Sequence, residues 1–420
     1  MANASVAATP DADSFPDPKA ARAGFRPIWL DALNFLLADV RGALGPYLNV
    51  VLVTEQHWSQ TDVGLMTTVS GFVGLAAQTP AGAAIDATNA KRAVVVISLA
   101  LLAAGAIVIF AWPSFWPVLI ANSALAIVGD VFGPAIAALT LGLYLKRALP
   151  DRMGRNGAFD HAGNVAIAVV AGGVGWLLGQ RAVFLLVPAF AALACVSTLA
   201  IPAASINHAR ARGSAEEGEK QGGWSALLEN KPLIGFGAAL MLFHFANAPL
   251  LPLVGQKIAL VHREWATAAM SACIVAAQVV MLPIALVCGR KAGVWGRRPI
   301  LLAGFAVLPI RAVLYTLSDN SAWLVAVQLL DGVGAGVLSV LTPLVVADFM
   351  RGAGRYNFAL GAVTPAPGVG ASLSGLATGV IVDRLGYSGA FLECAAAAVV
   401  ALATLWAFVP ESAGDEREQR

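Results

Sequence analysis

The amino-acid sequence predicts an all-α polytopic membrane protein with twelve transmembrane helices in two six-helix halves. Three observations support this prediction. Of 420 residues, 58% are hydrophobic and only 12% are charged, a composition far from that of a soluble domain. Apolar runs of about 20 residues, long enough to cross a bilayer, recur along the chain. Short motifs of the first half return in the same order 200 to 207 positions later.

Turn residues and charges divide the apolar sequence into twelve segments. We expect helices near residues 28–53, 61–85, 93–112, 115–144, 157–179, 182–202, 232–256, 266–289, 299–318, 321–346, 357–381 and 387–409. The polar interval 203–231 is expected to be a cytoplasmic linker between an N-terminal half, 26–202, and a C-terminal half, 232–410. Residues 1–25 and 411–420 are expected to be cytoplasmic tails, the first of them disordered.

The basic residues predict the orientation of these helices. With both termini in the cytoplasm, 21 of the 27 Lys and Arg residues fall in inner segments and only 4 in outer loops. This asymmetry follows the positive-inside rule. A net charge of +2, scattered among apolar runs, gives no basis for a nucleic acid partner. The four cysteines lie in apolar runs without metal-ligand spacing, so we predict no metal site and no cofactor.

A predicted polar turn between the second and third segments carries a motif: a glycine, an acid four positions on, and then a basic pair. The motif comprises Gly82, Asp86, Lys91 and Arg92. A weaker copy begins 207 positions later, has glycine in place of the acid, and comprises Gly289, Gly293, Arg297 and Arg298. A further echo joins Gly154-Arg155 to Gly354-Arg355, 200 positions apart. The glycines permit close helix packing, and the basic residues hold each turn on the cytoplasmic side.

This spacing resembles the loop signature of the major facilitator superfamily, and the resemblance covers about residues 25–410. It implies a monomeric transporter that moves a solute by rocking two halves about a site near the midplane. In that family the loop charges hold the cytoplasmic face closed when the cavity opens outward. The resemblance therefore implies a cytoplasmic gate, to which we assign Gly82, Asp86, Lys91, Arg92, Arg155, Arg297, Arg298 and Arg355.

The first predicted helix carries four polar candidates for a substrate or proton site: Asp31, Asn34, Asp39 and Arg41. Ionisable groups at membrane depth are costly, so each needs a partner or a function. Three of them share a face, which predicts a polar stripe along a water-filled cavity, with Arg41 near the midplane. The alternative is an ion pair between helices that serves only the structure. Asp39 points to the opposite side and is a candidate proton carrier.

Later helices supply four further candidates: Asp130, His244, Asn247 and Asp331. Asp130 is expected either to face Arg41, so that protonation loosens the pair, or to cap a helix break at Gly133-Pro134. Asp331 is the corresponding acid of the second half, with glycines that also fit a packing role. His244 and Asn247 share a helix face and suit substrate hydrogen bonds or helix packing. Arg311 is expected to be structural, because the family places the ninth helix outside the cavity.

The first functional hypothesis is proton-coupled efflux of a small organic solute across the inner membrane of a bacterium. The alternative within transport is proton-coupled uptake of an organic anion held by Arg41. The expected partners are the solute, protons and the lipid bilayer. A non-transporting sensor or a membrane-embedded enzyme belongs to another class, and the sequence shows neither a nucleophile with its base nor a phosphate-binding loop.

Overall fold

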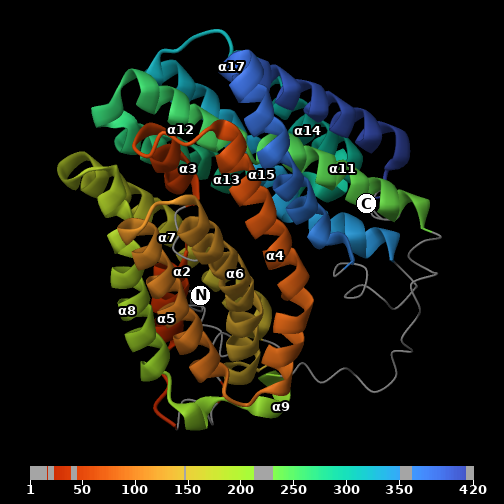
Figure 1. The fold of residues 1–420 in the computed structure, drawn as a ribbon. Helices are drawn as coiled ribbons and strands as arrows, with labels where there is room; N and C mark the ends of the chain where they lie inside the picture. Colours follow the sequence, from red (N-terminus) through yellow and green to blue (C-terminus); the bar gives the residue numbers. More distant parts are fainter. Residues whose placement is uncertain are drawn as a thin grey trace, which may run out of the picture.

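The computed structural model describes residues 17, 23–38, 45–145, 148–211, 230–350 and 362–412, and all its regular structure there is helical. Two bundles lie side by side (Figure 1). The N-terminal bundle contains α2 (Pro27–Leu37), α3 (Gly45–Thr54), α4 (Gln60–Ala87), α5 (Lys91–Ala111), α6 (Phe115–Leu143), α7 (Leu149–Leu178), η4 (Gln180–Leu185) and α8 (Leu186–Ala200). The C-terminal bundle contains α11 (Lys231–Asn247), α12 (Leu250–Val261), η6 (Arg263–Trp265), α13 (Ala266–Trp295), α14 (Arg297–Leu314), α15 (Ser321–Phe349) and α17 (Pro365–Phe408). Two short helices follow the first bundle, η5 (Ala203–Ser205) and α9 (His208–Ala211).

By length and composition, eight helical segments among the described residues can cross a membrane. The longest of them, α17, has 44 residues and contains Gly386 in a left-handed conformation with φ of +74°. This glycine divides α17 into the predicted eleventh and twelfth segments. The first predicted segment is represented by two shorter apolar helices, α2 and α3. The all-helical, membrane-spanning fold class is therefore confirmed.

Several predicted turns are shorter than expected. The helix α4 continues through Gly82 and Asp86 to Ala87, so that only residues 88–90 separate it from α5. Alanine favours helix, and the sequence after Gly82 is rich in it. The helix α13 likewise continues to Trp295 and leaves only Gly296, whose φ is +90°, before α14.

The fifth helix also starts earlier than predicted. The helix α7 begins at Leu149, with a proline in its first turn, and therefore includes Arg155, which we expected in a loop. Near the N-terminus, the structure describes Asp17, which contacts the N-terminal half and the short helix α9. Its amide donates to the Leu143 carbonyl at 3.1 Å and its carboxylate pairs with Arg210 at 2.5 Å.

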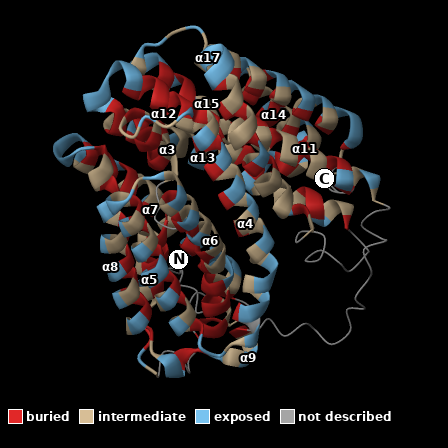
Figure 2. Ribbon diagram, viewed as in Figure 1, coloured by how far each residue is buried: buried red, intermediate tan, exposed pale blue. Residues whose placement is uncertain are grey.

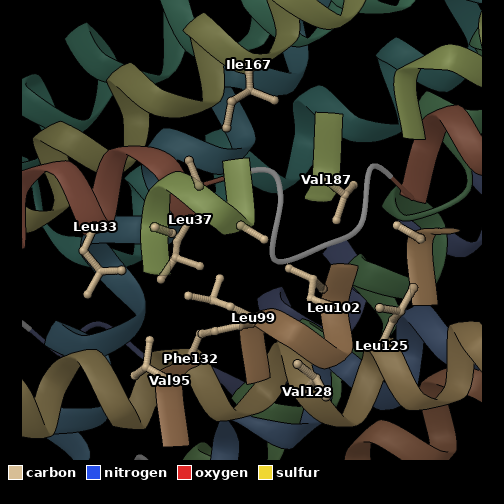
Figure 3. Close-up of a cluster of buried hydrophobic side chains, with 14 of the residues drawn as sticks. Leu33, Leu37, Val95, Leu99, Leu102, Leu125, Val128, Phe132, Ile167 and Val187 are labelled. Carbon is tan, nitrogen blue, oxygen red and sulfur yellow. The ribbon is translucent and has the colours of Figure 1, made fainter. Parts of the chain in front are cut away.

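Each bundle has its own buried apolar core. Figure 2 shows buried residues inside both bundles and exposed residues around them. In the N-terminal bundle the core includes Leu99, Leu125 and Phe132 (Figure 3). Many large apolar side chains are exposed on the outside, for example Leu178 at 74% and Trp176 at 58%. Such a surface is suited to lipid rather than water.

The two bundles repeat the same plan with an offset of 206 residues. The helices α5 and α14 begin at Lys91 and Arg297, and α6 and α15 each have 29 residues, beginning at Phe115 and Ser321. The structural offset is therefore one residue less than the motif comparison suggested. This offset allows positions in the two halves to be compared directly.

The bundles meet along α4 with α17, α7 with α13, and α3 with α12. Small residues permit the close approach: a Cβ added at Gly64 would lie 2.3 Å from the Gly375 carbonyl oxygen. Direct contacts begin where α4 starts, at Gln60, and reach about mid-depth, where His161 Nδ1 lies 3.1 Å from Gln278 Oε1. We call the end with Gln60 the closed end. The opposite end, with residues 88–90 and Gly296, is the open end, which the sequence predicts to be cytoplasmic.

Candidate functional site

A central cavity lies between the two halves. It consists of three adjoining spaces of about 180, 330 and 630 Å³. The first two share Asn49 and Thr67, and the last two share Thr67 and Asn122. The lining residues come from α3, α4 and α6 of one half and from α11, α12, α14, α15 and α17 of the other. Their side chains are mainly small, amide or hydroxyl groups, and among the described lining residues there is no aromatic ring.

An ion pair between Arg311 of α14 and Asp331 of α15 forms part of the cavity wall. Nη2 of the guanidinium also donates to the Asn247 side-chain oxygen at 2.8 Å. The Arg311 side chain is 2% exposed and that of Asp331 is 22% exposed, so the cavity meets mainly the carboxylate. Nε of Arg311 is buried and has no hydrogen-bond partner in the part of the chain that the structure describes. This guanidinium therefore has one unused donor, which is buried inside the C-terminal half.

The expectation that Arg311 lies away from the cavity is wrong. The helices α14 and α15 approach closely at two glycines, since a Cβ added at Gly334 would lie 3.7 Å from the Gly304 carbonyl oxygen. The long Arg311 side chain then reaches from α14 to the Asp331 carboxylate on α15. The sequence signal was a charged residue at membrane depth, which by itself marks a functional candidate.

Two buried side chains hold the Asp331 carboxylate in place. Gln328 donates from Nε2 to Asp331 Oδ2 at 3.1 Å, and the Tyr315 hydroxyl donates to Gln328 Oε1. Gln328 and Tyr315 are both 0% exposed. A chain of buried hydrogen bonds restricts the carboxylate to one orientation. Arg311, Asp331 and Asn247 thus form one positioned group.

Asp130 of α6 lines the largest space of the cavity. Its carboxylate lies beside α4, where a Cβ added at Gly74 would be 3.4 Å from Oδ2. No residue in the described ranges forms a hydrogen bond or an ion pair with it. The helix α6 continues unbroken through Pro134, so Asp130 does not cap a helix break. Its other expected partner, Arg41, lies outside the described residues, as does Asp39.

The remaining first-helix candidates lie away from the cavity as described. Asp31 pairs with Arg152 and with Arg155, both at 2.7 Å, and its side chain is 2% exposed. The Asn34 amide donates to the Asn156 side-chain oxygen at 3.2 Å. These contacts join α2 to α7 inside the N-terminal half. The geometry therefore favours the alternative for Asp31 and Asn34, a structural pairing between helices.

The His244 side chain also lies in the packing of its own half rather than at the cavity. Its Nδ1 lies 2.9 Å from the carbonyl oxygen of Leu240 in its own helix, and the ring packs against Phe243. It is not among the described residues that line the three spaces. Of the pair that shares a face of α11, the structure brings Asn247 to the cavity and leaves His244 in the helix packing.

The contacts described for the predicted gate residues of the first half lie within that half. Lys91 donates to the Ile85 carbonyl at 2.7 Å, and Arg92 donates from Nη2 to the Leu199 carbonyl at 2.7 Å. A Cβ added at Gly82 would meet no described atom within 4 Å, so Gly82 mediates no close packing among the residues that the structure describes. Asp86 lies in α4 without a described side chain, and Arg355 lies outside the described residues.

The contacts described for the basic pair of the second half, Arg297 and Arg298, likewise lie within that half. Arg297 pairs with Asp348, and its backbone amide donates to the Glu411 side chain at 2.9 Å. Arg298 instead donates to the Trp406 carbonyl oxygen at 2.6 Å. The contacts described for these basic residues all fall within one half, which is consistent with an open end.

Sequence reasoning missed a contact that joins the halves at the closed end. Asp383 of α17 accepts hydrogen bonds from the backbone amide of Gln60 at 3.1 Å and from the backbone amide of Thr61 at 2.8 Å. The Thr61 hydroxyl donates to the same carboxylate at 2.6 Å. An acid at the first turn of α4 interacts favourably with the unpaired amides there. The residues are more than 320 positions apart in sequence, so no local pattern indicates the pairing.

Two helical halves surround a central polar cavity, and the described contacts between them lie toward one end. This arrangement defines an integral membrane protein with the architecture of a transporter. The sequence model of the Major Facilitator Superfamily matches residues 30–304 and 245–420. The chain therefore belongs to this superfamily.

Relatives and solved structures agree with this assignment. The chain is 45% identical over 399 residues to an uncharacterised MFS-type transporter of Mycobacterium tuberculosis, found in two strains, with 94% of each chain covered. The fold resembles a crystal structure of the nucleoside transporter NupG with a TM-score of 0.71, and a mutant form of it with a TM-score of 0.75. Both comparisons show 14% identity and cover 91% of this chain and 98% or more of the other. These relatives are transporters rather than enzymes.

Proposed function

We propose that the protein exports a small organic solute in exchange for protons, by alternating access to the central cavity. The observation that carries this proposal is Asp130, a carboxylate in the largest space with no cationic partner among the described residues. A lone carboxylate in a cavity holds either a proton or a cationic group, but not both at once. Competition for one acid couples the outward movement of solute to the inward movement of protons.

The lining supports a polar solute rather than a flat aromatic one. Asn49, Thr67 and Asn122 offer hydrogen bonds where the three spaces adjoin, and both halves contribute. A solute that bridges the halves favours the conformation in which both sets of contacts form. Its protonated amine would meet Asp130, and its neutral polar groups would meet the amides.

The gates follow from the contacts between the halves. In the present conformation Asp383 joins the halves at the closed end, and the contacts described for Arg92 and Arg298 at the open end lie within one half each. Opening toward the other side requires Asp383 to leave the first turn of α4. The open end must then close, and the predicted charge contacts of Asp86 with the basic residues would hold it.

Proteoliposomes that contain a pH-sensitive dye test this proposal. Exchange of an added organic cation for internal protons raises the internal pH, and Asp130→Asn should reduce this signal to the background. Asp151→Asn is the matched control, because Asp151 is an exposed acid in the first turn of α7. Equal proton exchange by wild type and Asp130→Asn would refute the assignment.

A second candidate, proton-coupled uptake of an organic anion, is favoured by the Arg311–Asp331 pair. Protonation of Asp331 would release Nη1 of the Arg311 guanidinium, which belongs to the cavity wall, and an anionic solute could then bind it. In the same vesicles, entry of an anion with a proton lowers the internal pH. The sign of the pH change therefore distinguishes the two candidates.

A further inference from the structure

A second cavity lies on the outside of the N-terminal half, at the open end. It has a volume of about 390 Å³ and lies between the start of α5 and the region after α8. We call it the α5–α8 groove. Its walls include Ala93 and Val96 on one side and Leu199, Ala203 and His208 on the other, with Arg92 between them. It shares none of these residues with the central cavity.

The groove continues into an apolar surface on the outside of the bundle. On α5, Ile97 and Leu101 lie one turn apart and are 59% and 54% exposed. On the neighbouring α8, Leu193, Val196 and Leu199 follow one face and are 54% to 60% exposed. Large apolar side chains that are exposed on membrane-spanning helices face hydrocarbon. An occupant of the groove therefore has access to the acyl-chain region of the bilayer.

The inner wall of the groove is cationic. Arg92 uses Nε and Nη2 to donate to the carbonyl oxygens of Thr198, at 3.2 Å, and Leu199, at 2.7 Å, at the end of α8. A guanidinium has five N–H donors, so most remain available. Nδ1 of His208 is buried and has no hydrogen-bond partner among the described residues. No acidic side chain is found among the described residues that line the groove.

We propose that the α5–α8 groove binds an anionic phospholipid, with its phosphate on Arg92 and His208 and its acyl chains along α5 and α8. The apolar walls match the chains, and the uncompensated cation at the membrane edge matches the headgroup. A bound lipid occupies Arg92, which belongs to the predicted gate. Lipid binding would thus stabilise the conformation in which Arg92 stays on α8.

Native mass spectrometry of the full-length protein tests the proposal. The purified chain is titrated with phosphatidylglycerol, with phosphatidylcholine of equal chain length, and with inorganic phosphate. Wild type should retain phosphatidylglycerol preferentially, and Arg92→Gln should weaken its binding roughly fivefold. Arg298→Gln is the matched control, because Arg298 makes the corresponding contact with the Trp406 carbonyl. This control should bind phosphatidylglycerol as wild type does.

A second variant separates loss of the site from a general loss of folding. Ala203→Trp fills the groove without altering Arg92 and should reduce the binding of both lipids, while the unfolding temperature without lipid stays unchanged. Phosphatidylglycerol binding that is equal in wild type, Arg92→Gln and Ala203→Trp would overturn the proposal. Binding of inorganic phosphate with no preference between the two lipids would also overturn it. Solute transport does not enter these readouts, so they are independent of the proposed function.

Discussion

Two equivalent positions carry an ion pair in the C-terminal half and an apolar contact in the N-terminal half. With the offset of 206 residues, Arg311 and Asp331 of the C-terminal half correspond to Gly105 and Leu125 of the N-terminal half. There, a Cβ added at Gly105 would lie 2.8 Å from Leu125 Cδ2, so glycine and leucine pack directly against each other. Leu125 belongs to the apolar core in Figure 3. One half therefore has a packed contact where the other has an ion pair.

The reverse difference occurs five residues further along the same helices, α6 and α15. Asp130 of the N-terminal half corresponds to Gly336, where an added Cβ would lie 2.7 Å from the Met281 carbonyl oxygen. The helix starts therefore do not pair Asp130 with Asp331, which the sequence comparison predicts as the corresponding acid. Close packing therefore suffices to build each helix pair, and a charge is not needed for the fold. A buried ion pair gives little net stability compared with apolar side chains of similar size. The charges that occur in one half alone are thus best explained by function.

The largest expected effect tests whether the ion pair is needed for folding. Arg311→Met leaves Asp331 without its cation and should lower the free energy of unfolding by about 3–5 kcal/mol. The double variant Arg311→Met, Asp331→Leu restores an apolar contact like that of the other half. It should lose only on the order of 1 kcal/mol, because neither side chain is then left as an unpaired charge.

The comparison is measured by thermal unfolding in detergent together with transport in vesicles. We expect the double variant to fold but to lose proton-coupled transport. If the double variant were as unstable as the single one, the pair would be a structural requirement of the C-terminal half. If it transported normally, the functional explanation of the asymmetry would be wrong.

The second effect concerns a buried charge cluster at the open end. Asp31 compensates Arg152, whose side chain is 2% exposed, and also Arg155, which is 55% exposed. Asp31→Asn leaves Arg152 buried without a counter-ion and should cost about 3 kcal/mol of unfolding free energy. Arg155→Gln, which removes the exposed partner, should cost less than about 1 kcal/mol. The same unfolding assay measures both variants. Similar losses of unfolding free energy would show that the buried Asp31–Arg152 pair contributes no more than the exposed Asp31–Arg155 pair.

These contacts show which features the sequence could supply. Composition and apolar segment length were sufficient for the fold class, and the cost of charges in lipid identified Asp130 and Asp331 as unusual. Helical periodicity tells which residues share a face, but not which helix packs against that face. The partners Arg155 for Asp31 and Arg311 for Asp331 depend on the three-dimensional arrangement. Family knowledge of helix positions even misplaced Arg311, because a long side chain reaches beyond its own helix.

A third, smaller effect tests close packing in the half without the ion pair. Gly105→Leu inserts a side chain against Leu125 and should cost about 1–3 kcal/mol through overpacking. Gly173→Leu is the matched control, because a Cβ at Gly173 meets nothing within 4 Å. The control should unfold at the wild-type temperature. Equal tolerance of both substitutions would mean that this helix contact is not tightly packed and that the comparison with Arg311 fails.

The smallest effect concerns the closed end, where one half supplies the hydrogen-bond acceptor and the other half supplies the donors. The C-terminal half supplies the Asp383 carboxylate and the N-terminal half supplies the amides of Gln60 and Thr61. Asp383→Asn removes the charge and one strong acceptor, which should weaken the contact by about 1 kcal/mol. That energy corresponds to roughly a fivefold shift toward opening at this end.

The shift can be measured at Ser374, which lines the cavity near the closed end. In a Cys195→Ala background, Ser374→Cys should react about fivefold faster with an impermeant thiol reagent from the closed side when Asp383→Asn is present. Asp62→Asn is the control, because Asp62 accepts from Ser59 of its own half in the same turn. If both substitutions changed the labelling rate equally, general fraying of α4 would explain the effect. A change confined to Asp383→Asn would show that this carboxylate fastens one half to the other.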